Sequence, residues 1–241
     1  MPNFFVLLFG EVQRLQRYNI ITASAVVALI WIGVLYLTEL PDITLIFPLL
    51  IYVDCTSMAI LMVGVTIFFE KQEGSLRTML VTPINKFDYL LTKTVVAIVS
   101  SVITLLILYL YAINFKALNL NFIVLLGGVT LVALFHSMVG FLLTYQSRDF
   151  TSLLVNMIKY MFIFMLPTLF EHVRIIQHEV VEKILYIAPT KAAMLLLYSS
   201  TGEVATGDLI YALLYMGLGS AVLFVLALKQ FDQFAAKESG V

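Results

Sequence analysis

The densest run of charge in this 241-residue chain lies at residues 70–83, between two long apolar stretches. Glu73 and Arg77 are four residues apart in this run, a spacing that favours an ion pair along one face of a helix. Pro83 ends the helix, because proline lacks the amide hydrogen that continues the hydrogen-bond ladder. The run is therefore predicted to form a short helix that begins near Glu70, and a solvated charged loop is the alternative. The small apolar face of this helix would consist of Leu76, Met79 and Leu80.

Three ionisable side chains stand inside apolar stretches, where a charge costs about 2.5–3.5 kcal/mol on insertion scales. Asp54 lies near the middle of the stretch 45–69. Lys159 lies in the stretch 153–170, where it could pair with Asp54 or extend toward water. His136 lies in a third apolar stretch. Two interpretations apply to all three side chains: they line a translocation path, or they make structural bonds between helices.

No spacing typical of a catalytic or metal site is present in the sequence. His172 and His178 lack the H-E-x-x-H spacing that places two imidazoles around a metal ion. Neither a G-x-S-x-G elbow nor a G-x-x-x-x-G-K-[ST] phosphate-binding loop occurs. We therefore predict no catalytic residue, no metal site and no cofactor bound by this chain, with an intramembrane enzyme as a weaker alternative.

The composition is that of an integral membrane protein. Hydrophobic residues make up 61% of the chain and charged residues 12%, about half of the charged share in soluble domains. The formal net charge of −1 argues against nucleic acid as a partner. Cys55 is the single cysteine and cannot form an intramolecular disulfide, so cysteine content does not indicate the compartment. Arg14 and Arg17 follow the first apolar residues instead of preceding them, so no cleavable signal peptide is expected.

Six stretches approach the roughly 20 apolar residues that a helix needs to cross the hydrocarbon core. Their periodicity is helical and not the alternation of a strand. The predicted fold is therefore an all-α membrane protein, with a single transmembrane domain over residues 1–241. The expected spans are 20–37, 45–69, 89–113, 122–145, 153–170 and 209–228.

Two further segments are helical in pattern and too short to span. Residues 1–18 place apolar and charged side chains on different faces of a helical wheel, which predicts a helix lying in the membrane interface. The start of a longer first span is the alternative. Residues 171–207 contain two short apolar pieces separated by Pro189, which predicts a pair of short extracellular helices at the outer membrane face.

The distribution of lysine and arginine predicts which side of the membrane each loop faces. Nine such residues fall on the side of the N-terminus and four on the other side. Because cytoplasmic loops carry the excess of positive charge, both termini and the loop 70–88 are predicted to be cytoplasmic. The nine are Arg14, Arg17, Lys71, Arg77, Lys86, Lys93, Arg148, Lys229 and Lys237, and the four are Lys116, Arg174, Lys183 and Lys191.

The loop after the second span carries a recognisable set of residues: Glu70, Gly74, Ser75, Leu76, Leu80, Thr82 and Pro83, followed by Tyr89, Leu90 and Lys93 at the start of the third span. This set resembles the coupling-helix signature of type-2 ABC exporter permeases, which include bacterial drug and antibiotic export permeases. The layout is similar as well, with an N-terminal interfacial helix, six spans and paired short helices before the sixth. The resemblance covers nearly the whole chain, and only the coupling loop is motif-like.

The resemblance implies a half-transporter in the bacterial cell membrane. In such families two permease subunits, identical or paralogous, face each other among the membrane lipids. Each coupling helix contacts one of two cytoplasmic ATPase subunits, which bind the ATP and Mg. Carried over residue by residue, the ATPase contact would consist of Glu70, Glu73, Gly74, Leu76, Arg77, Leu80 and Pro83.

The resemblance further implies export of an amphipathic or hydrophobic substrate, such as a drug, an antibiotic or a peptide, through a cavity exposed alternately to the two sides. A lipid or lipid-linked polymer is the alternative substrate within the same family. A secondary transporter is the alternative from a different class, and it would need an inverted repeat or an ion relay.

Overall fold

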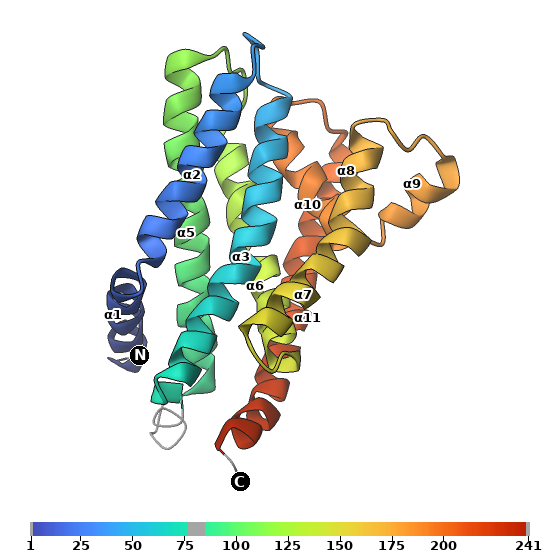
Figure 1. Cartoon of the computed structure of the whole chain (residues 1–241). Helices are drawn as coiled ribbons and strands as arrows, with labels where there is room; N and C mark the ends of the chain where they lie inside the picture. The colour runs from blue at the N-terminus through green and yellow to red at the C-terminus, as the bar shows by residue number, and fades with distance from the viewer. Residues whose placement is uncertain (1, 77–84, 240–241) are drawn as a thin grey trace.

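The computed structural model describes residues 2–76 and 85–239, and this part of the chain is built from helices joined by short connections (Figure 1). No strand occurs in the described residues apart from one isolated bridge between Asp42 and Ala117. The helices, in chain order, are α1 (Pro2–Arg17), α2 (Ile20–Leu37), α3 (Ile46–Gln72), α5 (Lys86–Phe115), α6 (Phe122–Gln146), α7 (Phe150–Tyr160), the π-helix η1 (Met161–Met165), α8 (Leu166–His172), α9 (Glu179–Leu185), α10 (Pro189–Tyr198), the 3-10 turn η2 (Ser199–Thr201) and α11 (Thr206–Ser239).

Six helical stretches are long and apolar enough to cross a membrane, which agrees with the all-helical, six-span prediction. Five of them are the single helices α2, α3, α5, α6 and α11, and the sixth is the continuous run Phe150–His172, made of α7, η1 and α8. The chain is therefore a multi-pass membrane protein. Several helices extend past the expected ends, because charged residues at a helix end reach the polar interface while the backbone stays helical.

The centre of the bundle is the packing of α3 against α6. In the most apolar window of each helix, 67% of the α3 residues and 56% of the α6 residues are buried, against 17% in α2 and in α11. A small residue permits the close approach: a Cβ atom at Gly140 of α6 would lie 3.0 Å from the carbonyl oxygen of Ile60 on α3. The outer helices α2 and α11 thus present most of their surface to the surroundings.

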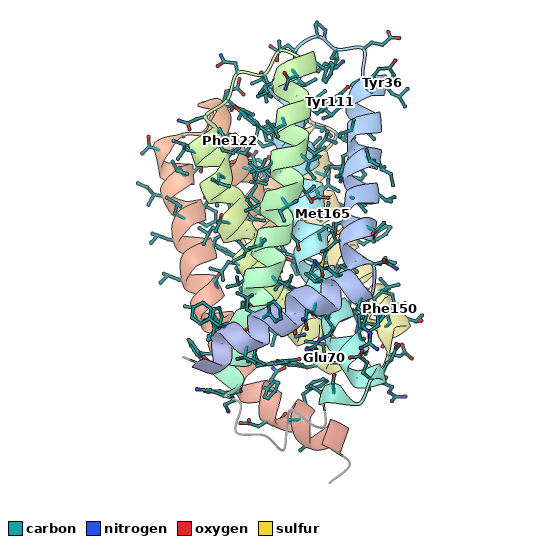
Figure 2. The ribbon with its side chains drawn as sticks, turned by 90° about the vertical axis from the view of Figure 1, so that its left-hand side faces the viewer. Tyr36, Glu70, Tyr111, Phe122, Phe150 and Met165 are labelled. Atoms are coloured by element: carbon teal, nitrogen blue, oxygen red, sulfur yellow. The ribbon has the colours of Figure 1, made fainter. Side chains whose placement is uncertain are left out.

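Both termini lie at one end of the bundle, and α9 lies toward the other end (Figure 1). Figure 2 shows α1 running across the end of the bundle, in front of the end of α3 where Glu70 is labelled. Its charged face points inward: Glu11 is buried, whereas Phe5 and Phe9 are exposed. This position suits a helix at the membrane surface, and its place in the interface stays a prediction.

The two short helices expected in residues 171–207 are α9 and α10. Pro189 is the first residue of α10, where its missing amide hydrogen costs nothing. Most residues of α10 are buried, against α3, α6 and α11, so this helix belongs to the core although it is too short to span.

The helix expected to begin near Glu70 differs in its start. Glu70 lies in the last turn of α3, which continues to Gln72, and the chain then turns at Glu73 and Gly74. Gly74 has a φ of 71°, a left-handed conformation that suits glycine. Arg77, Leu80 and Pro83 lie outside the described residues, as does the predicted pairing of Arg77 with Glu73. The long apolar run before Glu70 explains the difference, because a helix already formed continues at low cost.

Candidate functional site

A cluster of charged side chains joins three helices at the end of the bundle that carries both termini. Glu11 and Arg14 come from α1, where the i,i+3 spacing places them on one face. Tyr89 and Lys93 come from the first turns of α5 and are one helical turn apart. Glu70 comes from the last turn of α3. We call these five residues the buried charge network.

Lys93 and Glu70 form the centre of the network. The Lys93 Nζ donates to Glu70 Oε1 at 2.6 Å and to Glu11 Oε1 at 2.7 Å. The Tyr89 hydroxyl donates to the other oxygen of Glu70, Oε2, at 2.6 Å. The Arg14 guanidinium also donates to Glu70 Oε1. Each oxygen of the Glu70 carboxylate therefore has a partner, and its partners come from two other helices.

The charges of the network cancel, since two carboxylates face two cations. This balance matters because Glu70 is fully buried, and Lys93 and Glu11 are only 2% and 3% exposed. Burial raises the pKa of Glu11, but the positive charges of Lys93 and Arg14 lower it, and the net pKa lies below its ordinary value. The second Glu11 oxygen, Oε2, is buried without a hydrogen-bond partner in the described part of the chain.

A second, more exposed set of contacts ties the end of α1 to the end of α3. The Tyr18 hydroxyl donates to Glu73, and an Arg17 nitrogen lies 3.4 Å from the same carboxylate. The Tyr18 ring stacks on Phe69 with centroids 4.1 Å apart and an interplanar angle of 2°. In the described residues, the side-chain partners of Glu73 thus come from α1 and the connection that follows it.

Some of the residues that were predicted to contact an ATPase are buried, and others lie at the surface. Glu70 and Leu76 are buried, whereas Glu73 is exposed and Gly74 lies at the turn. The sequence pattern predicted no site role for Glu11 or Arg14, and it marked Lys93 only as part of the signature at the start of the third span. Their spacing was one available signal, because Glu11 and Arg14 share a helix face and Lys93 follows Tyr89 by one turn at the start of an apolar span.

Asp54 and Lys159 do not meet. Asp54 is 4% exposed, and its Oδ1 accepts a hydrogen bond from Trp31 Nε1 of α2 at 2.9 Å. Lys159 is exposed on α7, and no ion pair joins it to Asp54. Both residues are described, so the alternative in which Lys159 extends toward the surroundings fits the structure better than pairing. The Asp54 hydrogen bond attaches the middle of α2, a helix that is otherwise little buried, to α3.

His136 is fully buried between helices. Its Nδ1 lies 2.9 Å from the carbonyl oxygen of Val132, and its Nε2 lies 3.2 Å from the Tyr160 hydroxyl of α7. Both ring nitrogens are therefore engaged within the chain. This arrangement suits a structural link between α6 and α7, and it leaves no nitrogen for a ligand.

One face of α3 remains partly open along most of its length. The open residues recur every four positions, which places them in a single stripe: Val53, Ser57, Leu61, Val65 and Phe69. We call this stripe the α3 seam. An apolar groove of about 320 Å³ borders it on the side of α7 and η1, and one of about 280 Å³ borders it on the side of α2. The first groove is lined by Val53, Ile158, Met161, Phe162, Met165, Leu166 and Leu169.

Comparison with known proteins gives a consistent family. The model of the fluoroquinolones export permease protein family matches residues 6–239. Among curated proteins, fluoroquinolones export permease proteins from two strains of Mycobacterium tuberculosis are each 26% identical over 233 residues, covering 96% of this chain and 95% of the relative. No solved structure matches the chain. These findings agree with the resemblance to drug-export permeases.

Proposed function

The chain belongs to the fluoroquinolones export permease protein family, and on that basis we propose that it is the membrane-spanning subunit of an ATP-driven drug exporter. The observation that carries the coupling part of the proposal is the buried charge network. It binds the end of α3 and the start of α5, the two helices that flank residues 77–84, to each other and to α1. A displacement applied between these two helix ends would therefore move three helices together.

The proposed partner is a cytoplasmic ATPase subunit that binds ATP and Mg, since this chain has no phosphate-binding loop. Exposed Glu73 and the Gly74 turn would contact it, together with Arg77, Leu80 and Pro83 from the part of the chain that is not described. Buried Glu70 and Leu76 would support that contact from inside. Two permease subunits and two ATPase subunits would form the complete exporter, and ATP closure would alternate the exposure of a cavity between the permeases.

The α3 seam is the proposed lining of the translocation path. It is apolar apart from Ser57, and the grooves on both sides of it are almost entirely apolar. Such a surface suits an amphipathic aromatic molecule more than a small ion. The relatives' names give fluoroquinolones as the first substrate class to test. Asp54 follows the seam residue Val53 in the sequence, and its Oδ1 accepts a hydrogen bond from Trp31 Nε1.

The test is to purify the tagged protein gently from its native membrane and identify the proteins that remain bound. We compare the wild type with Glu73→Ala and with a matched control, Glu203→Ala. The control also removes an exposed carboxylate, one that lies just before the start of α11. The proposal expects a phosphate-loop ATPase with the wild type and the control, and less of it with Glu73→Ala. Fluoroquinolone accumulation in cells should rise in the same variant.

Two outcomes would redirect the proposal. A chain that purifies without any ATPase and still moves solute would indicate a secondary transporter. A complex that contains the ATPase but exports lipid, and not fluoroquinolones, would keep the coupling scheme and change the substrate.

A further inference from the structure

The last helix, α11, is longer than a membrane span requires. Its 34 residues extend about 51 Å, whereas the hydrocarbon core is about 30 Å thick. Asp208 and Lys229 are consecutive charged residues in this helix, so the excess length lies mostly after Lys229. Figure 1 shows this part projecting beyond the other helices, at the end that carries both termini. We call residues 229–236 the α11 tail.

Two aromatic side chains hold the α11 tail against the bundle. Phe231 and Phe234 are buried, at 8% and 6% exposure. The Phe234 ring stacks on Tyr145 of α6 with centroids 4.8 Å apart. The centroid of the Phe231 ring lies 6.3 Å from that of Tyr145 and 5.4 Å from that of Tyr89 of α5. Because such aromatic pairs stabilise packing beyond the area that they bury, the tail has a defined position against α5 and α6.

The first turn of α5 meets α11 at two further points. The Lys86 Nζ lies 2.6 Å from Asp232 Oδ2 of the tail. The Phe87 ring packs on Phe224, which precedes the tail in α11, with ring centroids 5.3 Å apart. The ion pair is exposed and contributes little energy by itself. Its position is informative, because together with the Phe231 contact it fixes both the start of α5 and the direction in which α5 enters the bundle.

Tyr89 connects the tail to the buried charge network. Its hydroxyl donates to Glu70 at 2.6 Å, and its ring packs on Phe231 of the tail. The tail is therefore linked through one side chain to the end of α3, and through Phe234 to α6. These contacts form a continuous path from the end of α3 and the start of α5 to α6 and α11.

We infer that the α11 tail is a positioning element for coupling: it fixes the start of α5 and carries displacement of that helix end to α6 and α11. The inference rests on the proposed function, because a partner ATPase has to supply the displacement. Phe231 and Phe234 of the tail act through Tyr89 and Tyr145 and need not touch the substrate. The physical basis is that packed aromatic side chains transmit displacement, since a packed interior is not freely compressible.

The first test removes the aromatic contacts of the tail. The double variant Phe231→Ala, Phe234→Ala is compared with the double variant Lys229→Ala, Gln233→Ala, which changes exposed residues of the same tail. Export and ATP hydrolysis are both measured in the complete complex. We expect export per ATP hydrolysed to fall roughly 5–150-fold in the aromatic variant, the range typical of coupling free energies, and to stay unchanged in the control. A proportional fall in export and hydrolysis would indicate lost folding or assembly and would contradict the inference.

The second test does not depend on a destabilised variant. Lys86→Cys and Asp232→Cys are joined by a short bismaleimide in a Cys55→Ala background, which removes the only native thiol. If the tail and the start of α5 move as one body, cross-linked complexes keep their export activity. Loss of export on cross-linking, with the ATPase still bound, would overturn the inference. A wild-type complex that shows no ATP-dependent export would instead refute the proposed function.

Discussion

Lys93 decides whether the buried charge network is stable. Without this ammonium group, Glu11 would lose its ion pair at 2.7 Å and keep the longer one to Arg14 at 3.6 Å, and Glu70 would keep Arg14 and Tyr89. The network then holds two carboxylates and one cation in a buried site. An unbalanced buried charge is much more costly than the balanced network is favourable, so the main function of Lys93 in stability is compensation.

Replacing Lys93 by methionine tests this compensation. The change keeps most of the length and the apolar character of the side chain's stem and removes its charge, so the free energy of unfolding should fall by about 3–5 kcal/mol. Thermal unfolding of the detergent-solubilised protein measures the loss. Lys159→Met is the matched control, because Lys159 is exposed and its removal should leave the midpoint nearly unchanged. Equal midpoints for the two variants would show that the network does not depend on Lys93.

The lowered pKa of Glu11 makes a prediction about acid. A carboxyl whose pKa is lower in the folded protein contributes stability above its unfolded pKa, near 4.3, and loses that contribution as the pH falls through its folded pKa. Glu11→Gln should therefore be less stable than the wild type by a constant amount above about pH 5, and the difference should shrink below about pH 4. Unfolding midpoints of the wild type and of Glu11→Gln, taken from pH 8 down to pH 3.5, measure this difference in stability. A difference that grows in acid would mean that the Glu11 pKa is raised.

The contact between α3 and α6 depends on glycine at one position. A Cβ atom at Gly140 would lie 3.0 Å from the backbone oxygen and 3.1 Å from the Cα atom of Ile60, and a backbone cannot rotate away as a side chain can. Gly140→Ala should cost about 1–3 kcal/mol by overpacking. Gly127→Ala on the same helix meets nothing within 4 Å and should cost nothing. Unfolding midpoints compare the two, and equal values would mean that α3 and α6 separate without cost.

The π-helix η1 is stabilised by hydroxyl groups from other turns. The Thr190 hydroxyl of α10 donates to the Phe164 carbonyl at 2.6 Å and lies 3.0 Å from the Thr168 hydroxyl. Thr190→Val preserves the shape and removes both bonds, so it should cost about 0.5–1.5 kcal/mol for each bond. Thr130→Val is the control, because the hydroxyl of exposed Thr130 donates to the Leu126 carbonyl of its own helix. Proteolysis at the connection between α8 and α9 would report loosened α10 docking in the first variant alone.

The six spans could be predicted from the sequence, whereas the π-helix η1 and the burial of Glu70 could not. The six spans were predictable because apolar length alone determines whether a helix can cross the membrane. The π-helix had no signal, since Met161–Met165 is an apolar run inside an apolar stretch, and the Thr190 hydroxyl that bonds its Phe164 carbonyl lies 26 residues away. Glu70 was expected at the start of a surface helix. Its partners Arg14 and Lys93 lie 56 and 23 residues away, so only the folded chain shows that it is buried.

The whole bundle has two different ends. One end holds α1, the buried charge network and the α11 tail. Elsewhere, Glu171 of α8 pairs with Lys191 of α10, and Tyr186, which follows α9, donates to Asp208 of α11. Between them, α2 and α11 leave most of their apolar surface exposed, which suits contact with lipid or with a second copy. The proposed ATPase contact lies at one of these ends, so the proposed function requires a fixed orientation in the membrane.

Single-cysteine labelling in a Cys55→Ala background tests that orientation. Lysine and arginine number nine on the side of the termini and four on the other, which predicts that the end with the termini is cytoplasmic. A membrane-impermeant maleimide added to intact cells should therefore label Glu203→Cys and leave Asp232→Cys unlabelled, although both residues are exposed. Opening the cells should make Asp232→Cys reactive, which controls for accessibility. The reverse pattern would place the α11 tail and Glu73 outside the cell, where no ATP is available, and the proposed coupling could not operate.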